Sequence, residues 1–104
     1  EKSPVVQSAI KYCVEKGIPV GAICAAPSIL GKLGLLNGRK AVCFPGFEQY
    51  LTGAEVLNKL CVTDGQFTTA CGVGAAIEFG LELAKVLCGE KRSTELRSAI
   101  VADR

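Results

Sequence analysis

The chain has 104 residues, of which 49% are hydrophobic, with 12 basic and 10 acidic side chains. This apolar content excludes a disordered chain, which needs low hydrophobicity and high net charge. No basic cluster with interleaved aromatics points to nucleic acid. No apolar run reaches the roughly 18–20 residues of a membrane span. We therefore expect one globular domain, with neither nucleic acid nor membrane as a partner.

The six cysteines are widely spaced, and the chain contains no histidine. Zinc sites use ligand pairs separated by roughly two to four residues, so this spacing argues against a metal centre. No cofactor is expected either. Most of the cysteines lie in apolar runs, where cysteine behaves as a small buried hydrophobe. We expect Cys13, Cys61 and Cys88 in the core, and reduced thiols of this kind are typical of a cytoplasmic protein.

The first half of the chain predicts helix, strand, helix and strand in that order. Ser3 and Pro4 resemble a helix start, and apolar residues at helical spacing continue to Lys16, where Gly17 ends the helix. A continuous apolar run over 18–24 predicts a strand buried on both faces of a sheet. The elements that follow are a helix over 27–33, a strand over 40–44 and, over 47–58, loop with some helix.

The second half begins with a predicted hairpin. Asp64-Gly65 lies between two strand-like runs, 60–63 and 66–70, which is a strong signal for a two-residue turn. A helix over 75–88 follows, and its only polar stripe contains Glu78, Glu82 and Lys85. We expect this helix to be buried on most sides, with the stripe in solvent. A last helix runs from 93 to about 101.

Strands that alternate with helices predict an α/β sheet with helices on both faces. Only about four strands are predicted, so the sheet would keep a bare edge. The chain also begins without Met. We therefore expect residues 1–104 to be a single incomplete domain that lacks its amino-terminal part.

The segment Ala22-Ile-Cys-Ala-Ala26 lies where the first strand turns into a helix. A nucleophile elbow needs small residues two positions before and two after the nucleophile, because strand and helix approach closely there. The helix amino terminus favours an anion, and the thiolate is the reactive form of cysteine. Cys24 is thus a candidate nucleophile, with the Ala25 N–H as its oxyanion-hole donor. On these residues alone, a packed core cysteine is an equally good interpretation.

Three segments, in this order, resemble the DJ-1/ThiJ branch of the DJ-1/PfpI superfamily. They are Val20-Gly-Ala-Ile-Cys-Ala-Ala-Pro-Ser28, Lys40-Ala-Val-Cys-Phe-Pro-Gly-Phe-Glu48 and Thr69-Ala-Cys-Gly-Val-Gly-Ala-Ala-Ile-Glu-Phe-Gly-Leu81. The resemblance implies a flavodoxin-like three-layer α/β sandwich, of which this is only the carboxy-terminal part, and a homodimer. It also implies that Cys24 is the reactive cysteine.

The activities implied by this resemblance are of the glyoxalase or deglycase type, on small dicarbonyls such as methylglyoxal, in oxidative or carbonyl stress. The alternatives are a non-catalytic redox sensor oxidised by peroxide, a chaperone-like homodimer, or an inactive fragment. A peptidase is not expected, because the protease-like branch has His where this chain has Ala25.

The resemblance also indicates what surrounds Cys24. Phe44 replaces a His that some relatives carry, and the 72–74 loop is expected to line the same crevice, so the predicted pocket comprises Phe44, Gly72, Val73 and Gly74. In the DJ-1 branch a Glu from the amino-terminal half is the proton-transfer partner of the cysteine. This chain lacks that half, so we expect it to be a poor enzyme by itself.

Cys71 lies just before this loop, between a predicted strand and a helix. It could resolve a sulfenic acid formed on Cys24. The alternative is a loop thiol without a role.

Overall fold

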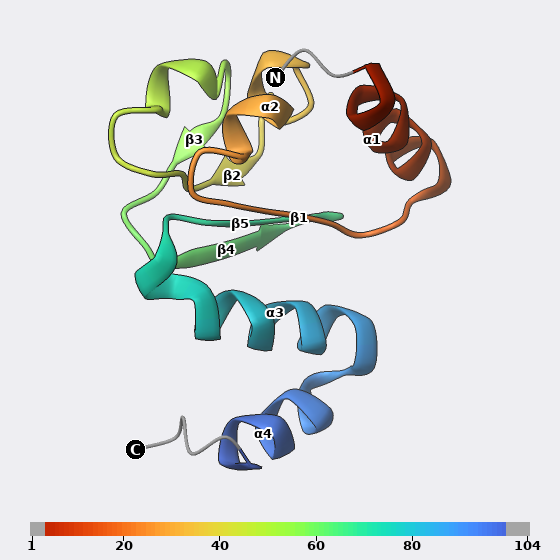
Figure 1. Cartoon of the computed structure of the whole chain (residues 1–104), viewed down its shortest axis with the longest axis vertical. Coiled ribbons are helices and arrows are strands. Elements are labelled where there is room, and N and C mark those ends of the chain that lie inside the picture. Colours follow the sequence, from red (N-terminus) through yellow and green to blue (C-terminus); the bar gives the residue numbers. More distant parts are fainter. Residues whose placement is uncertain (1–3, 100–104) are drawn as a thin grey trace.

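A three-stranded sheet lies at the centre of the structure, a computed structural model that describes residues 4–99 (Figure 1). Strand β1 (Val20–Ile23) pairs in parallel with β5 (Phe67–Ala70), and β5 pairs antiparallel with β4 (Cys61–Asp64). Two shorter parallel strands, β2 (Lys40–Ala41) and β3 (Glu55–Val56), form a second sheet. The result is an α/β fold with a mixed main sheet.

Helices lie on both faces of the main sheet, which gives three layers (Figure 1). One outer layer contains α1, α2 and the small β2–β3 sheet, and the other contains α3 and α4. The helices are α1 (Pro4–Lys16), α2 (Pro27–Lys32), α3 (Ala76–Cys88) and α4 (Glu90–Ala99), with 3-10 turns η1 (Glu48–Tyr50) and η2 (Val73–Ala75). None of these helices is long and apolar enough to cross a bilayer.

The apolar core fills the space between the main sheet and the α2 layer. Leu36 and Ala41 are fully buried there, and Leu30 of α2 packs into the same cluster. The cluster comprises Ala22, Leu30, Leu36, Ala41, Cys43, Leu51 and Phe67. Gly21 of β1 faces the opposite layer, where a Cβ would lie 3.0 Å from the Phe79 ring of α3. The close approach of α3 explains why a residue without a side chain occupies this position.

Most of the predicted elements are confirmed, with shifted ends. The first helix spans 4–16 as predicted, although its expected N-cap, Ser3, lies outside the described residues. The strand predicted over 40–44 is regular only at Lys40–Ala41. Beyond it, the Val42 N–H donates to Thr69 Oγ1 and the Phe44 N–H to the Cys24 carbonyl, so no single strand pairs with the whole segment. Strand β3 falls within the segment predicted as mainly loop.

The hairpin is confirmed, but its turn lies one residue later than predicted. Asp64 pairs with Phe67, so Gly65 and Gln66 form the turn. Gly65 has a φ of +63°, as expected for the first central residue of a type II′ turn. The Asp64 carboxylate accepts the Lys40 N–H at 2.7 Å, which keeps Asp64 in the strand. Gln66 then donates to two carbonyls at the end of α1 and in the loop after it, and so ties the hairpin to that layer.

Helix α3 is less buried than predicted. Leu81 is its only buried residue, whereas Ile77 is 58% and Leu87 66% exposed. The helix contacts the sheet on one side and α4 on another, and nothing in residues 4–99 covers its remaining apolar surface. Cys88, at its last position, is exposed rather than in the core. Strand β1 likewise pairs only with β5 within these residues.

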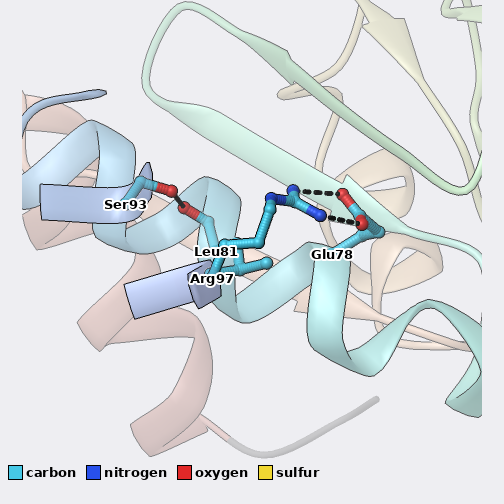
Figure 2. A network of polar contacts seen from close by, with 4 residues as sticks. All are labelled: Glu78, Leu81, Ser93 and Arg97. Carbon is cyan, nitrogen blue, oxygen red and sulfur yellow. Dashed lines mark hydrogen bonds and ion pairs between the residues drawn. The ribbon is translucent and has the colours of Figure 1, made fainter. Parts of the chain in front are cut away.

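Two polar contacts hold α4 against α3 (Figure 2). Arg97 donates to both carboxylate oxygens of Glu78, at 2.9 and 3.0 Å, and the Ser93 hydroxyl donates to the Leu81 carbonyl at 2.7 Å. Glu78 is thus an ion-pair partner rather than part of a purely solvated stripe. The helix predicted over 93–101 begins earlier, at Glu90, and positions 100–101 lie outside the described residues.

The Glu78–Arg97 pair predicts a stability loss in acid. Hydrogen bonding from Arg97, followed by its charge, lowers the Glu78 pKa from its ordinary value of 4.5. A lowered carboxyl pKa stabilises the fold above the unfolded pKa, and this contribution disappears as pH falls through the folded value. Glu78→Gln should therefore lose less stability than wild type between about pH 5 and pH 3. Because the pair is partly exposed, the effect should be roughly 0.2–1 kcal/mol in urea unfolding.

Glu95→Gln is the matched control, since Glu95 contacts Arg92 on the exposed side of α4. An acid dependence of Glu78→Gln that equals that of wild type would contradict the assigned pair.

The two glycines within helices predict opposite effects of the same substitution. A Cβ on Gly31 of α2 would meet the Tyr50 carbonyl and lie 2.8 Å from the Leu51 Cα, both backbone atoms. Gly31→Ala should therefore cost roughly 1–3 kcal/mol through overpacking. A Cβ on Gly80 of α3 has nothing within 4 Å, so Gly80→Ala should stabilise by roughly 0.5–1 kcal/mol. Urea unfolding measures both, and an equal shift for the two variants would refute this packing.

Candidate active site

Cys24 occupies the turn between β1 and α2, and its backbone is left-handed. Its φ of +63° is the only positive value at a non-glycine position within residues 4–99. For an L-residue with a side chain this conformation costs roughly 1–2 kcal/mol. Such residues persist only where the surrounding structure holds them, and they concentrate at functional sites. The sharp strand-to-helix turn predicted for a nucleophile elbow is therefore present at Cys24.

Backbone hydrogen bonds from three parts of the chain hold this turn. The Cys24 N–H donates to the Ala70 carbonyl of β5 at 3.0 Å, and the Cys24 carbonyl accepts the Phe44 N–H at 2.8 Å. The Ala26 N–H closes the turn onto the Ile23 carbonyl at 3.1 Å. Cys24 thus has little freedom to leave its strained conformation.

Ser28 is a positioning residue that the sequence analysis missed. Its hydroxyl donates to the Ala25 carbonyl at 2.6 Å, and its N–H donates to the same oxygen at 3.0 Å. The signal was a serine three residues after Ala25, at the start of a helix, where such side chains bond local backbone groups. Ser28 is buried, so this contact fixes the Ala25–Ala26 peptide unit, the next unit after the one that carries the Ala25 N–H.

The Ala25 N–H is the one amide of this turn that donates to no acceptor within residues 4–99. The neighbouring N–H groups of Cys24, Ala26 and Ser28 all have partners. A fixed and unused donor beside a cysteine is what an oxyanion hole requires. This geometry agrees with the role predicted for Ala25, which stays a prediction.

The predicted pocket residues fall into two groups. Phe44 bonds to Cys24 through its N–H, and its ring faces Gly72, where a Cβ would lie 3.5 Å from the ring. The Phe44 backbone therefore lies beside Cys24, and Gly72 lies beside the Phe44 ring. Val73, which is 84% exposed, and Gly74 lie on η2, further along the chain. Their part in substrate binding stays a prediction.

Two buried or half-buried thiols, Cys43 and Cys61, have raised pKa values. Burial, followed by the charge of Glu48, raises the pKa of Cys43. Burial, followed by the charge of Glu82, raises the pKa of Cys61 to about 11. Cys61 lies on a cavity of about 600 Å³ that the sequence did not reveal, between β4 and α3, with Lys40, Lys59 and Lys85 in its wall. Because the thiolate is the nucleophile, a raised pKa lowers the reactive fraction of Cys43 and of Cys61.

Metal chemistry has no evident ligands at the candidate site. In the part of the chain that the structure describes, no three His, Cys, Asp or Glu side chains are grouped to hold a metal ion. The available groups are a thiol, backbone amides and an aromatic ring.

The fold and the site together define an α/β protein with a cysteine at a left-handed turn between a strand and a helix. The chain belongs to the DJ-1/PfpI family, whose model matches residues 1–86. It is 33% identical over 84 residues to protein dj-1beta of Drosophila melanogaster. This alignment covers 79% of this chain and 45% of the relative. It is 30% identical over 95 residues to the glutathione-independent glyoxalase DJR-1.2 of Caenorhabditis elegans, covering 89% of this chain and 50% of the relative.

The crystal structure of Drosophila melanogaster DJ-1beta has the same fold. It matches with a TM-score of 0.88 and 29% identity, over 96% of this chain and 55% of the other. This similarity confirms that the α/β arrangement corresponds to part of a DJ-1 fold. The chain spans about half the length of these relatives.

The left-handed backbone predicts that glycine at position 24 gives a more stable protein than valine. Cys24→Gly relieves the strain and should change the free energy of unfolding by less than ~1 kcal/mol, since glycine also costs chain entropy. Cys24→Val should cost roughly 1–3 kcal/mol, because a β-branched side chain opposes positive φ. Urea unfolding compares the two variants.

The same two substitutions at Cys61, in the regular strand β4, serve as the control. There the valine variant should be the more stable one, since strands favour β-branched residues over glycine. If valine were more stable than glycine at both positions, the strain at Cys24 would be disproved.

Proposed function

We propose that Cys24 is the nucleophile of a site that acts on small dicarbonyls such as methylglyoxal, in a glyoxalase- or deglycase-type reaction. The observation that carries the proposal is the left-handed Cys24 beside the unused Ala25 N–H. Similarity to a relative named as a glutathione-independent glyoxalase supports it.

In this mechanism the Cys24 thiolate attacks the aldehyde carbon of the dicarbonyl. A carbon–sulfur bond forms, and the carbonyl electron pair moves to oxygen, which gives a hemithioacetal oxyanion. The Ala25 N–H, whose peptide unit is held by the Phe44 N–H bonded to the Cys24 carbonyl, donates a hydrogen bond to that oxygen. We expect the apolar Phe44 side chain, which lies beside Gly72, to line the substrate pocket.

Turnover then needs a group that moves a proton between carbon and oxygen. We assign this step to a carboxylate outside these 104 residues, because no Glu of the chain is a candidate by motif and the chain spans about half of its relatives. Positioned proton transfer is typically worth 10²–10⁴-fold in rate. The chain by itself should consequently form the adduct and turn it over slowly.

The protein would work in a reducing, cytoplasmic environment as a homodimer, in response to carbonyl or oxidative stress. Six free thiols support the first point. The exposed apolar surface of α3 is consistent with further association.

A redox sensor is the alternative function, and the partly exposed Cys24 thiol favours it as a target of peroxide. The two functions differ in turnover. A sensor is oxidised at Cys24 but consumes no dicarbonyl.

Cys24→Ser tests the proposal. With methylglyoxal, wild type should give a Cys24 adduct by intact mass and a slow loss of dicarbonyl, and Cys24→Ser should lose both. Cys88→Ser, which removes an exposed thiol at the end of α3, is the control and should keep both. Equal methylglyoxal consumption by Cys24→Ser and wild type would refute Cys24 as the nucleophile. Oxidation of Cys24 without any dicarbonyl chemistry would favour the sensor.

A further inference from the structure

The cavity between β4 and α3 contains none of the residues of the Cys24 turn. Its wall comes from the start of β2, the connection between β3 and β4, β4 itself and α3. These segments lie far apart in the sequence and meet only in the folded chain. The volume of about 600 Å³ falls within the roughly 300–1,000 Å³ that small-molecule sites occupy. The cavity is thus large enough for a small organic ligand.

Positive charge predominates in the wall of this cavity. Three lysines line it, Lys40, Lys59 and Lys85, against one acidic residue, Glu82, so the lining carries a net charge of +2. Within residues 4–99, none of the three ammonium groups forms an ion pair. A hollow lined by charges of one sign raises the local concentration of ligands of the opposite sign. The cavity is therefore suited to an anion.

Much of the remaining wall is apolar. Val62 of β4 is buried, Leu57 is half-buried, and Val86 of α3 lies on the same cavity. Cys61 also lines it, and burial, followed by the charge of Glu82, raises the pKa of this thiol to about 11. Cys61 is consequently neutral at pH 7 and adds to the apolar surface. A ligand with an apolar or aromatic body would bury that body here.

The charge and the type of donor favour a phosphate group over other anions. A phosphomonoester carries about −1.5 to −2 charges at pH 7, which matches the net charge of the lining. Lysine binds phosphate as a compact point charge, whereas the flat, bidentate recognition of carboxylates is typical of arginine. The lining contains three lysines and no arginine.

Protection of a sheet edge is the other role open to these lysines. The order of the main sheet is β1-β5-β4, so β4 is an edge strand within the described residues. Lysines on edge strands discourage pairing with another chain. That role requires cations along the strand edge only, whereas Lys85 belongs to α3 and lines the same cavity as Lys40 and Lys59. Convergence from separate elements favours a ligand.

We propose that this cavity binds a small phosphomonoester with an apolar or aromatic body. Lys40, Lys59 and Lys85 hold the phosphate, and the body packs against Leu57 and Val62. The inference adds a second binding site to the chain and does not rest on the function proposed for the Cys24 turn.

The proposal is tested by NMR titration of the backbone amides of the whole chain with phenyl phosphate at low salt. We expect saturable shifts concentrated at positions 57–63 and 82–86. Phenyl sulfate has the same body but one charge, and should bind about fivefold more weakly. Inorganic phosphate has the charge without the body, and should also bind more weakly. Raising the ionic strength from about 0.02 to 0.2 M should weaken phenyl phosphate binding.

Charge variants give the second measurement. Lys59→Gln and Lys85→Gln should each weaken phenyl phosphate binding about three- to tenfold. Glu82→Gln should strengthen it, because the change removes negative charge from the wall. Lys11→Gln is the matched control, since Lys11 is an exposed lysine of α1 in the opposite layer (Figure 1). All four variants should keep the wild-type consumption of methylglyoxal, since none lies at the Cys24 turn.

Several results would overturn the inference. If phenyl phosphate caused no saturable shifts at these positions, or bound both lysine variants as tightly as wild type, edge protection would be the role of the lysines. Equal affinities for phenyl phosphate and phenyl sulfate would contradict a site for a dianion. Equal affinities for phenyl phosphate and inorganic phosphate would contradict the apolar part of the site. Each of these results leaves the chemistry proposed for Cys24 intact, and failure of that chemistry leaves phosphate binding intact.

Discussion

The left-handed backbone at Cys24 is the constraint on which the rest of the site depends. It costs roughly 1–2 kcal/mol, and the hydrogen bonds around it each contribute about 0.5–1.5 kcal/mol. These bonds come from β5, from the segment after β2 and from the start of α2. The site therefore exists only when the elements on both sides of the turn have assembled.

The same arrangement distinguishes one thiol among six. Burial raises the pKa of both Cys43 and Cys61, which lowers their thiolate fractions. Cys13 and Cys88 lie on helices, away from the carboxyl end of the sheet. Within residues 4–99, only Cys24 combines partial exposure with a left-handed turn and a neighbouring amide that has no acceptor. All six residues are cysteines, so only their positions in the fold distinguish them.

The two faces of the main sheet are covered to different extents. The face toward α2 encloses the core cluster. On the other face, Ile77 and Leu87 of α3 remain exposed. The Glu78–Arg97 and Ser93–Leu81 contacts hold α3 against α4. This pattern accords with a chain that covers about half of its relatives' length. The Cys24 turn is thus held by well-packed elements, although the α3–α4 layer on the opposite face has exposed apolar side chains.

The sequence by itself determined the local structure: the first helix, the hairpin, and an elbow with small residues on both sides of Cys24. Those features depend on neighbours in the chain, through helical periodicity, turn residues and steric limits at a sharp bend. Only the tertiary structure decided that Gly65-Gln66 forms the turn, that α3 is half exposed, and that Ser28 bonds the Ala25 carbonyl. It alone brought the Phe44 N–H to the Cys24 carbonyl and the Phe44 ring to Gly72, because those contacts join segments far apart in the sequence.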